Sequence, residues 1–231
     1  MLDAQQLRWA SDLKPVDGDY SLPGYYDIDH GRRFRYYRAS TVGHNTLLVN
    51  GFNQALGAET EIVAFRAKPT EPAVVVLDLT AAYPDCLRVR RGFALIDGKH
   101  VLIVDELTPK KKMTVAWQMH TKAVPSGEQV VKLVQKDASK ADKEFFVRIL
   151  EPATGKFTIQ KDPGGAQPGE APSAGIHKLV ATWSDVEEPI RIAVYLSSDA
   201  KPIAYLREPL DGPLWYWIDW AGKAPDPQRA A

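Results

Sequence analysis

The sequence predicts an all-β fold, an antiparallel two-sheet β-sandwich. Three observations support this prediction: apolar runs of strand length recur along the chain, turn residues separate them, and helical patterns are weak. The 17 prolines and 16 glycines among the 231 residues are dispersed, as expected for many short strands joined by turns. A chain of this length can bury a sizeable core in one domain. We expect one domain over residues 1–222 and a frayed tail over residues 223–231.

Two dipeptides predict tight hairpin turns. Asn50-Gly51 follows the β-rich residues 45–49, and Asp97-Gly98 separates the apolar runs 88–96 and 99–104. A type I′ turn needs a positive φ at both central residues, which Asn, Asp and Gly tolerate best. The Asp-Gly pair has an apolar run on each side, so it gives the strongest hairpin signal in the chain.

Residues 114–120 alternate in polarity with a period of two. An extended strand here would place Val115, Trp117 and Met119 on one face and polar residues, including His120, on the other. This segment is therefore predicted to be a strand that lies between a core and a more polar environment. Further strands are expected at residues 73–79, 129–135, 145–150, 178–184, 190–197 and 214–220.

Three segments have the composition of loops. Residues 135–144 would suit a helix in composition but lack an apolar stripe, so a solvated loop is favoured. Residues 161–175 contain three prolines and four glycines, which predicts a long surface loop. The lysines at 110–112 form a charge run in a turn, which is more typical of a solvated surface than of a ligand patch.

Composition and charge exclude several classes of protein. The 29 Lys and Arg residues balance 29 Asp and Glu residues, which argues against nucleic-acid binding driven by bulk charge. No apolar run reaches the roughly 18 residues of a membrane span, and the N-terminal residues lack the pattern of a signal peptide. The single cysteine, Cys86, excludes a disulfide scaffold and a cysteine-rich zinc finger.

The most unusual segment is 32–38, where four arginines alternate with three aromatic residues. The planar guanidinium of Arg fits carboxylate and sulfate groups, and aromatic rings stack on sugar faces, so the segment suits an acidic polysaccharide. Single-stranded nucleic acid would also fit, but the zero net charge disfavours it. A strand with aromatic residues in the core and arginines paired with Asp27 or Asp29 explains the pattern equally well.

The N-terminal quarter of the sequence resembles a known family. It contains Arg8-Trp9-Ala10-Ser11-Asp12-Leu13, then Asp19-Tyr20-Ser21-Leu22-Pro23-Gly24-Tyr25-Tyr26, then Tyr36-Tyr37-Arg38 and Gly43-His44-Asn45-Thr46. In order and spacing these motifs resemble the C-terminal β-sandwich of heparinase II/III-like polysaccharide lyases, closest to the heparinase II-type branch. The resemblance is strong over about residues 7–122 and looser beyond.

The resemblance implies a function. Members of the family join an N-terminal α/α toroid covalently to the sandwich and cleave uronate-containing polysaccharides by β-elimination. We therefore expect the sandwich portion of a periplasmic or secreted lyase, without its first strand or strands and inactive alone, because the main catalytic residues lie in the toroid. The expected partners are that toroid and an acidic polysaccharide, with no nucleic acid and no membrane span. The alternative is a free-standing β-sandwich module that binds acidic carbohydrate.

The resemblance also implies site residues. Asp12 and His44 match two ligands of a structural zinc ion, whose third ligand would come from a His-x-His-x-Asp-type motif that this chain does not contain. Tyr20 and Tyr25 are candidates for the catalytic tyrosine that the sandwich contributes, although loop aromatics that cap the core would fit equally well. Arg38 either contacts the acidic sugar or forms a structural ion pair. From spacing alone, the sequence shows no metal-binding or nucleotide-binding motif.

Overall fold

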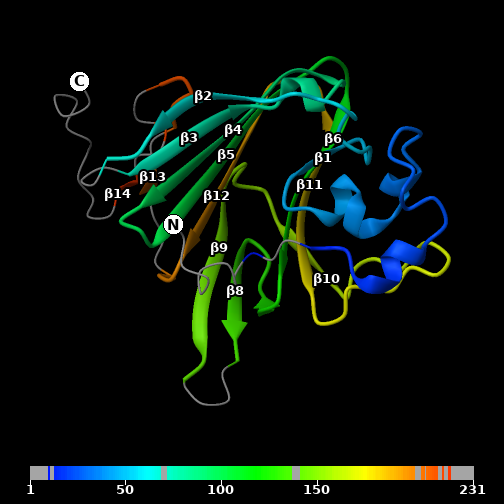
Figure 1. The fold of residues 1–231 in the computed structure, drawn as a ribbon. Coiled ribbons are helices and arrows are strands. Elements are labelled where there is room, and N and C mark those ends of the chain that lie inside the picture. Colours follow the sequence, from blue (N-terminus) through cyan, green and yellow to red (C-terminus); the bar gives the residue numbers. More distant parts are fainter. Residues whose placement is uncertain are drawn as a thin grey trace.

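The computed structural model shows two antiparallel sheets packed face to face, which confirms the predicted all-β sandwich (Figure 1). It describes residue 10 and residues 13–68, 72–136, 141–200, 204–205, 207–212, 215 and 218–219. Asp12, the expected tail at 223–231 and most of the strand expected at 214–220 lie outside the described residues. No helix among the described residues has the length and apolar character needed to cross a membrane.

The small sheet has four strands in the order β1-β6-β11-β10. Its central strands β6 and β11 run antiparallel, with Ala181 opposite Trp117 and Lys178 opposite His120. The strand bounds are β1 (Leu47–Val49), β6 (Met113–Thr121), β10 (Phe157–Lys161) and β11 (His177–Val186).

The large sheet has eight strands in the order β2-β3-β4-β5-β12-β9-β8-β7. A separate pair, β13 (Ala204–Tyr205) and β14 (Ile218–Asp219), forms a two-stranded ribbon. The bounds in the large sheet are β2 (Glu61–Arg66), β3 (Ala73–Asp78), β4 (Cys86–Ile96), β5 (His100–Pro109), β7 (Val124–Ser126), β8 (Val130–Gln135), β9 (Lys143–Glu151) and β12 (Ile190–Ser197).

The two turn predictions have different outcomes. Asp97 and Gly98 take φ values of 50° and 64° and join β4 to β5, which confirms the hairpin. Asn50 and Gly51 also have positive φ values, but β1 pairs with β6 rather than with a strand that follows the turn. An isolated antiparallel bridge joins Val49 to Phe52 and closes this turn, so the dipeptide forms the tight turn that it favours, although no strand of the sheet follows it.

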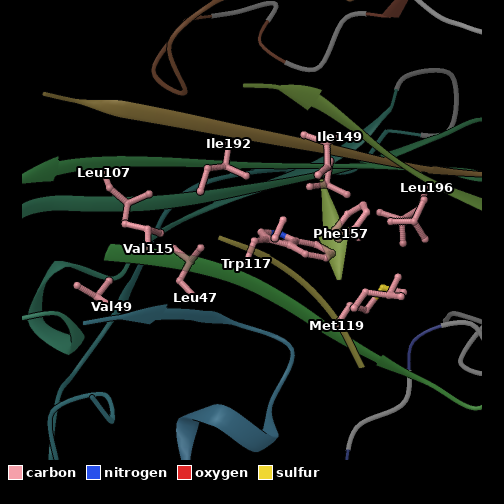
Figure 2. Close-up of a cluster of buried hydrophobic side chains, with 14 of the residues drawn as sticks. Leu47, Val49, Leu107, Val115, Trp117, Met119, Ile149, Phe157, Ile192 and Leu196 are labelled. Carbon is pink, nitrogen blue, oxygen red and sulfur yellow. The ribbon is translucent and has the colours of Figure 1, made fainter. Parts of the chain in front are cut away.

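The main core fills the space between the two sheets (Figure 2). From β6, Val115, Trp117 and Met119 point into it, which confirms the apolar face predicted for this strand. The Trp117 ring lies against Phe157 of β10, with ring centroids 5.8 Å apart. The large sheet contributes the facing layer, which includes Leu107, Ile149, Ile192 and Leu196.

The outer face of the large sheet carries a second apolar cluster. Leu210 and Trp215, from the segment after β12, pack on this face. Gly92 of β4 makes the contact possible, because a Cβ atom there would lie 2.5 Å from the Leu210 side chain and 2.8 Å from the Trp215 ring. A side chain at this position would therefore push the segment away from the sheet.

Residues 13–46 form no strand and run through short 3-10 helices, including η3 (Arg32–Arg35), η4 (Tyr37–Ala39) and η5 (Thr41–Gly43). We call residues 13–46 the excursion. The extended strand considered for residues 32–38 is wrong. Lying beside the small sheet (Figure 1), the excursion makes turns that leave many backbone carbonyls available for side chains of that sheet.

Trp117→Ala is expected to lower the free energy of unfolding by about 3–5 kcal/mol, because it removes a large buried side chain from the centre of the core. Urea denaturation of the full chain measures this change. As a control, Leu87→Ala alters a side chain that is 62% exposed and should change stability by less than about 0.5 kcal/mol. Equal effects of the two substitutions would contradict the assignment of Trp117 to the core.

Candidate functional site

The second face of β6 is polar, and yet it is buried. Gln118 is 2% exposed and His120 is 0% exposed, because the excursion covers this side of the small sheet. Lys178, the partner of His120 on β11, is also buried. Buried polar groups are costly unless they are hydrogen-bonded, so the covering segment has to supply partners for these three side chains.

The loop at residues 41–46, which we call the His44 loop, supplies backbone acceptors. The Gln118 side-chain amide donates to the carbonyls of Thr41 and His44, at 2.6 and 3.0 Å. The Lys178 ammonium donates to the Val42 carbonyl at 2.8 Å. Side chains of β6 and β11 therefore hold the loop at Thr41, Val42 and His44, which presents this half-buried histidine on a fixed backbone.

A third attachment comes from the interior of the sandwich. Arg91 of β4 donates from Nη1 to the Asn45 carbonyl at 3.2 Å. Its Nε and Nη2 atoms donate to the two carboxylate oxygens of Asp105 on β5, at 2.6 and 3.0 Å. This bidentate pair is buried, and the carboxylate fixes the direction of the guanidinium. The large sheet therefore also holds the His44 loop.

His120 joins the excursion through both of its ring nitrogens. Its Nε2 lies 2.9 Å from the Tyr37 hydroxyl, and its Nδ1 lies 2.9 Å from Oδ1 of Asn45. The Asn45 side chain also accepts the backbone N–H of His120, at 2.7 Å. The ring is thus hydrogen-bonded at both nitrogens within the protein, which is the arrangement of a structural histidine.

Lys178 is a buried cation beside this network. Its ammonium lies 5.3 Å from the centre of the Tyr37 ring, and burial lowers its pKa to about 8. Burial, followed by the nearby Glu170 carboxylate, raises the pKa of the Tyr37 hydroxyl, which therefore stays protonated at neutral pH. Positive charge accordingly lies beneath the His44 loop at neutral pH.

Arg38 is buried within the excursion. Its Nη1 donates to Asp19 at 2.9 Å, and its Nη2 donates to the carbonyls of Ala171 and Pro172. Ala171 and Pro172 lie in the long loop predicted at 161–175. This loop packs against the excursion, although the sequence suggested only a surface loop. Arg38 therefore makes the structural ion pair that we considered for it, and a contact with substrate stays a prediction.

The candidate tyrosines lie in an aromatic cluster of the excursion. Tyr25 is 1% exposed, and the Tyr20 and Tyr26 rings meet its ring edge-on at 5.3 and 5.6 Å. The Arg33 guanidinium lies 4.5 Å from the centre of the Tyr25 ring. Tyr20 and Tyr26 are exposed to solvent. We call these four residues the tyrosine–arginine surface.

Protonation of Tyr25 depends on two opposing influences. Burial raises the pKa of its hydroxyl, whereas the Arg33 guanidinium lowers it. The pKa remains above the usual value, so the Tyr25 hydroxyl stays protonated at neutral pH. The Tyr25 hydroxyl is buried and has no hydrogen-bond partner among the described residues.

Of the two expected metal ligands, His44 alone lies within the described residues. Among the described residues, no group of three or more His, Cys, Asp and Glu side chains is placed to hold a metal ion. Asp12 lies outside those residues. His44 is on the rigid loop, and imidazole with carboxylate is a donor set that suits zinc.

The sequence reasoning missed the residues that hold the His44 loop. His120 stood on the polar face predicted for residues 114–120, so its burial under a second layer could have been suspected. Lys178 and Glu170 carried no such signal, because their partners are more than 130 positions away in the sequence.

The chain is similar to known proteins in sequence and in fold. The family described as "Heparinase II/III-like, C-terminal" matches residues 22–177. A heparan sulfate lyase HepC mutant from Pedobacter heparinus is 13% identical, with a TM-score of 0.64 over 88% of this chain and 31% of that chain. A heparinase III, the BT4657 gene product with methylated lysines, is 17% identical, with a TM-score of 0.60 over 87% of this chain and 31% of that chain.

A further solved heparinase III is 14% identical, with a TM-score of 0.57, over 74% of this chain and 27% of that chain. Identities this low show a shared fold. This chain therefore corresponds to only 27–31% of the length of the three solved proteins. A comparison with curated proteins gave no match.

Lys178→Met is expected to change how stability depends on pH. The pKa of Lys178 is about 8 in the folded protein, against an ordinary value of 10.5. Between these values the unfolded chain binds more protons than the folded one, so the contribution of Lys178 to the unfolding free energy rises with pH. The unfolding free energy of the wild type, relative to that of the variant, should therefore rise by at most about 3 kcal/mol across this window.

Urea denaturation at several pH values between 7 and about 10.5 measures this difference. Lys156→Met is the matched control, because this lysine is exposed and pairs with Glu128 at the surface. Wild type and Lys178→Met with parallel pH profiles would contradict a buried, proton-releasing lysine.

Proposed function

Because this chain belongs to the heparinase II/III-like C-terminal family, we propose that it is the sandwich portion of a polysaccharide lyase that cleaves a uronate-containing acidic polysaccharide by β-elimination. The family match over residues 22–177 carries the proposal, since it includes the His44 loop and three of the four residues of the tyrosine–arginine surface, Tyr25, Tyr26 and Arg33. The named relatives include a heparan sulfate lyase, so heparan sulfate is the first substrate to test.

β-Elimination makes three chemical demands: the uronate carboxylate must be neutralised, the C5 proton removed and the leaving oxygen protonated. In this proposal the exposed Tyr20 can donate a proton to the leaving oxygen, whereas Tyr25 could do so only after its buried hydroxyl is uncovered. Arg33 stacks on Tyr25 and is only partly buried, which suits it to a carboxylate or sulfate group of the substrate.

In this proposal, other catalytic groups come from a toroid domain joined to the sandwich. The solved relatives are about three times as long as the matched region, which leaves room for such a domain. The base that removes the C5 proton would then come from outside this chain, and the chain alone would be inactive. The parent protein would act in the periplasm or outside the cell, where such polysaccharides are accessible.

A binding module without catalysis is the second candidate. The exposed rings of Tyr20 and Tyr26 beside Arg33 favour it, because aromatic and guanidinium groups can bind acidic sugar without any reaction. The two candidates differ in the complete gene product. A lyase would form the ultraviolet-absorbing unsaturated uronate there, whereas a binding module would never form it.

Arg33→Ala is expected to weaken binding of the chain to heparan sulfate by about tenfold, because one charge-assisted contact is lost. Isothermal titration calorimetry at low salt measures the affinity, and wild-type binding should weaken as salt is added. In parallel, ultraviolet absorbance of the isolated chain with heparan sulfate should stay constant.

The matched control is Lys132→Ala, which removes an exposed cation of β8 outside the excursion. Affinity that falls equally in both variants would indicate nonspecific charge attraction. Steady release of unsaturated uronate by the isolated chain would contradict the need for a second domain.

Zinc is the cofactor that we propose for this region. Asp12 and His44 would be two of its ligands, with a further protein ligand from outside the chain, and the ion would have a structural role. Since a structural zinc ion is almost always bound by four ligands in a tetrahedral arrangement, two ligands alone should bind it weakly.

His44→Ala and Asp12→Ala, each in the complete gene product, are expected to lower the zinc content from about one ion per chain. Loss of the ion should also lower the midpoint of thermal unfolding. Elemental analysis after gel filtration measures the metal, and His30→Ala, which alters an exposed histidine, is the control. Full zinc occupancy in both variants would show that the ligands lie elsewhere.

A further inference from the structure

The edge strand β2 is exposed in a way that the proposed function does not explain. Within the described part of the chain it forms one edge of the large sheet, as Figure 1 shows, and none of its six side chains is buried. Two large apolar side chains stand out: Ile62 is 65% exposed and Phe65 is 72% exposed. An edge strand also offers a row of backbone N–H and C=O groups to another strand.

A bulge in β2 decides which side chains share a face. Ile62 lies opposite Leu77 of β3, and Phe65 lies opposite Val75, so the register skips Val63. Residues opposite each other in a ladder point to the same side, and Leu77 and Val75 are two positions apart. Ile62 and Phe65 therefore share a face of the sheet, although they are three positions apart in the sequence.

The charged ends of β2 follow the same register. Glu61 lies opposite Asp78 and Arg66 lies opposite Val74, four positions further back on β3. Glu61 and Arg66 therefore share the other face of the sheet. The strand thus has one acidic and one basic end on one face, and two large apolar side chains on the other.

This arrangement makes β2 complementary to a second copy of itself. In an antiparallel pair related by a two-fold axis, the two residues opposite each other must already share a face. Glu61 and Arg66 meet this requirement, and so do Ile62 and Phe65. Without the bulge, neither pair would meet it.

We propose that β2 is a homodimer interface, in which two copies of this chain pair antiparallel and join their large sheets edge to edge. Glu61 of one copy then lies opposite the partner's Arg66, and Ile62 lies opposite the partner's Phe65. Opposite charges and apolar pairs at facing positions stabilise an antiparallel ladder. Because the strand is short, the contact is small and the dimer dissociates on dilution.

Sedimentation velocity of the full chain over a concentration series tests the proposal. Wild type should pass from monomer to dimer as its concentration rises. Phe65→Lys should raise the dimer dissociation constant at least about tenfold, because it places a charge at an apolar position of the interface. Ile159→Lys is the control, because it alters an exposed apolar residue on β10, the edge of the small sheet, and should leave dimerisation unchanged.

Charge exchange tests the register itself. Glu61→Arg or Arg66→Glu alone places like charges opposite each other and should weaken the dimer, whereas the double variant E61R/R66E should restore it. Circular dichroism checks that each variant is folded. A wild type that stays monomeric at every concentration would overturn the proposal, as would a dimer that neither Phe65→Lys nor the single charge changes weaken.

Discussion

Strand β6 has to be buried on both faces, and much of the rest of the structure follows from this constraint. Its apolar side chains fill the sandwich, and Trp117 lies at the centre of that core (Figure 2). Its other side chains include Gln118 and His120, which are equally buried. Each polar group left unpaired there would cost about 1–3 kcal/mol, so the second layer must offer hydrogen-bond partners as well as cover.

The irregular backbone of the excursion supplies these hydrogen-bond partners. Carbonyl groups within a regular helix or strand are already bonded to other backbone groups, whereas tight turns leave several of them available. In the His44 loop these carbonyls accept hydrogen bonds from Gln118, Lys178 and Arg91, which come from three different strands. Side chains from three strands thereby hold the His44 loop, which favours a fixed position for His44.

Local signals in the sequence predicted much of the fold and little of the candidate site. The apolar run at 190–197 formed β12 with both ends as predicted, and Asp97-Gly98 formed its hairpin turn. Both signals are local, because apolar patterns and turn residues depend on neighbouring positions in the sequence. Residues 32–38 did not form a strand, since Arg38 is bound by Asp19 and by the loop near residue 171. Contacts across such sequence distances have no local signature. The resemblance to a family indicated candidate residues such as Arg38, but it did not indicate what they contact.

The buried cation has a consequence for the proposed substrate. Lys178 has no carboxylate within ion-pairing distance among the described residues, and burial alone lowers its pKa. Its positive charge is therefore poorly screened and lies directly below the Val42 carbonyl of the His44 loop. A uronate carboxylate or sulfate bound above this loop would stabilise the protonated form of Lys178, and by linkage the protonated form would strengthen binding of that anion. The polar layer that covers β6 thus also places a positive charge beneath the His44 loop, where it would favour an acidic ligand.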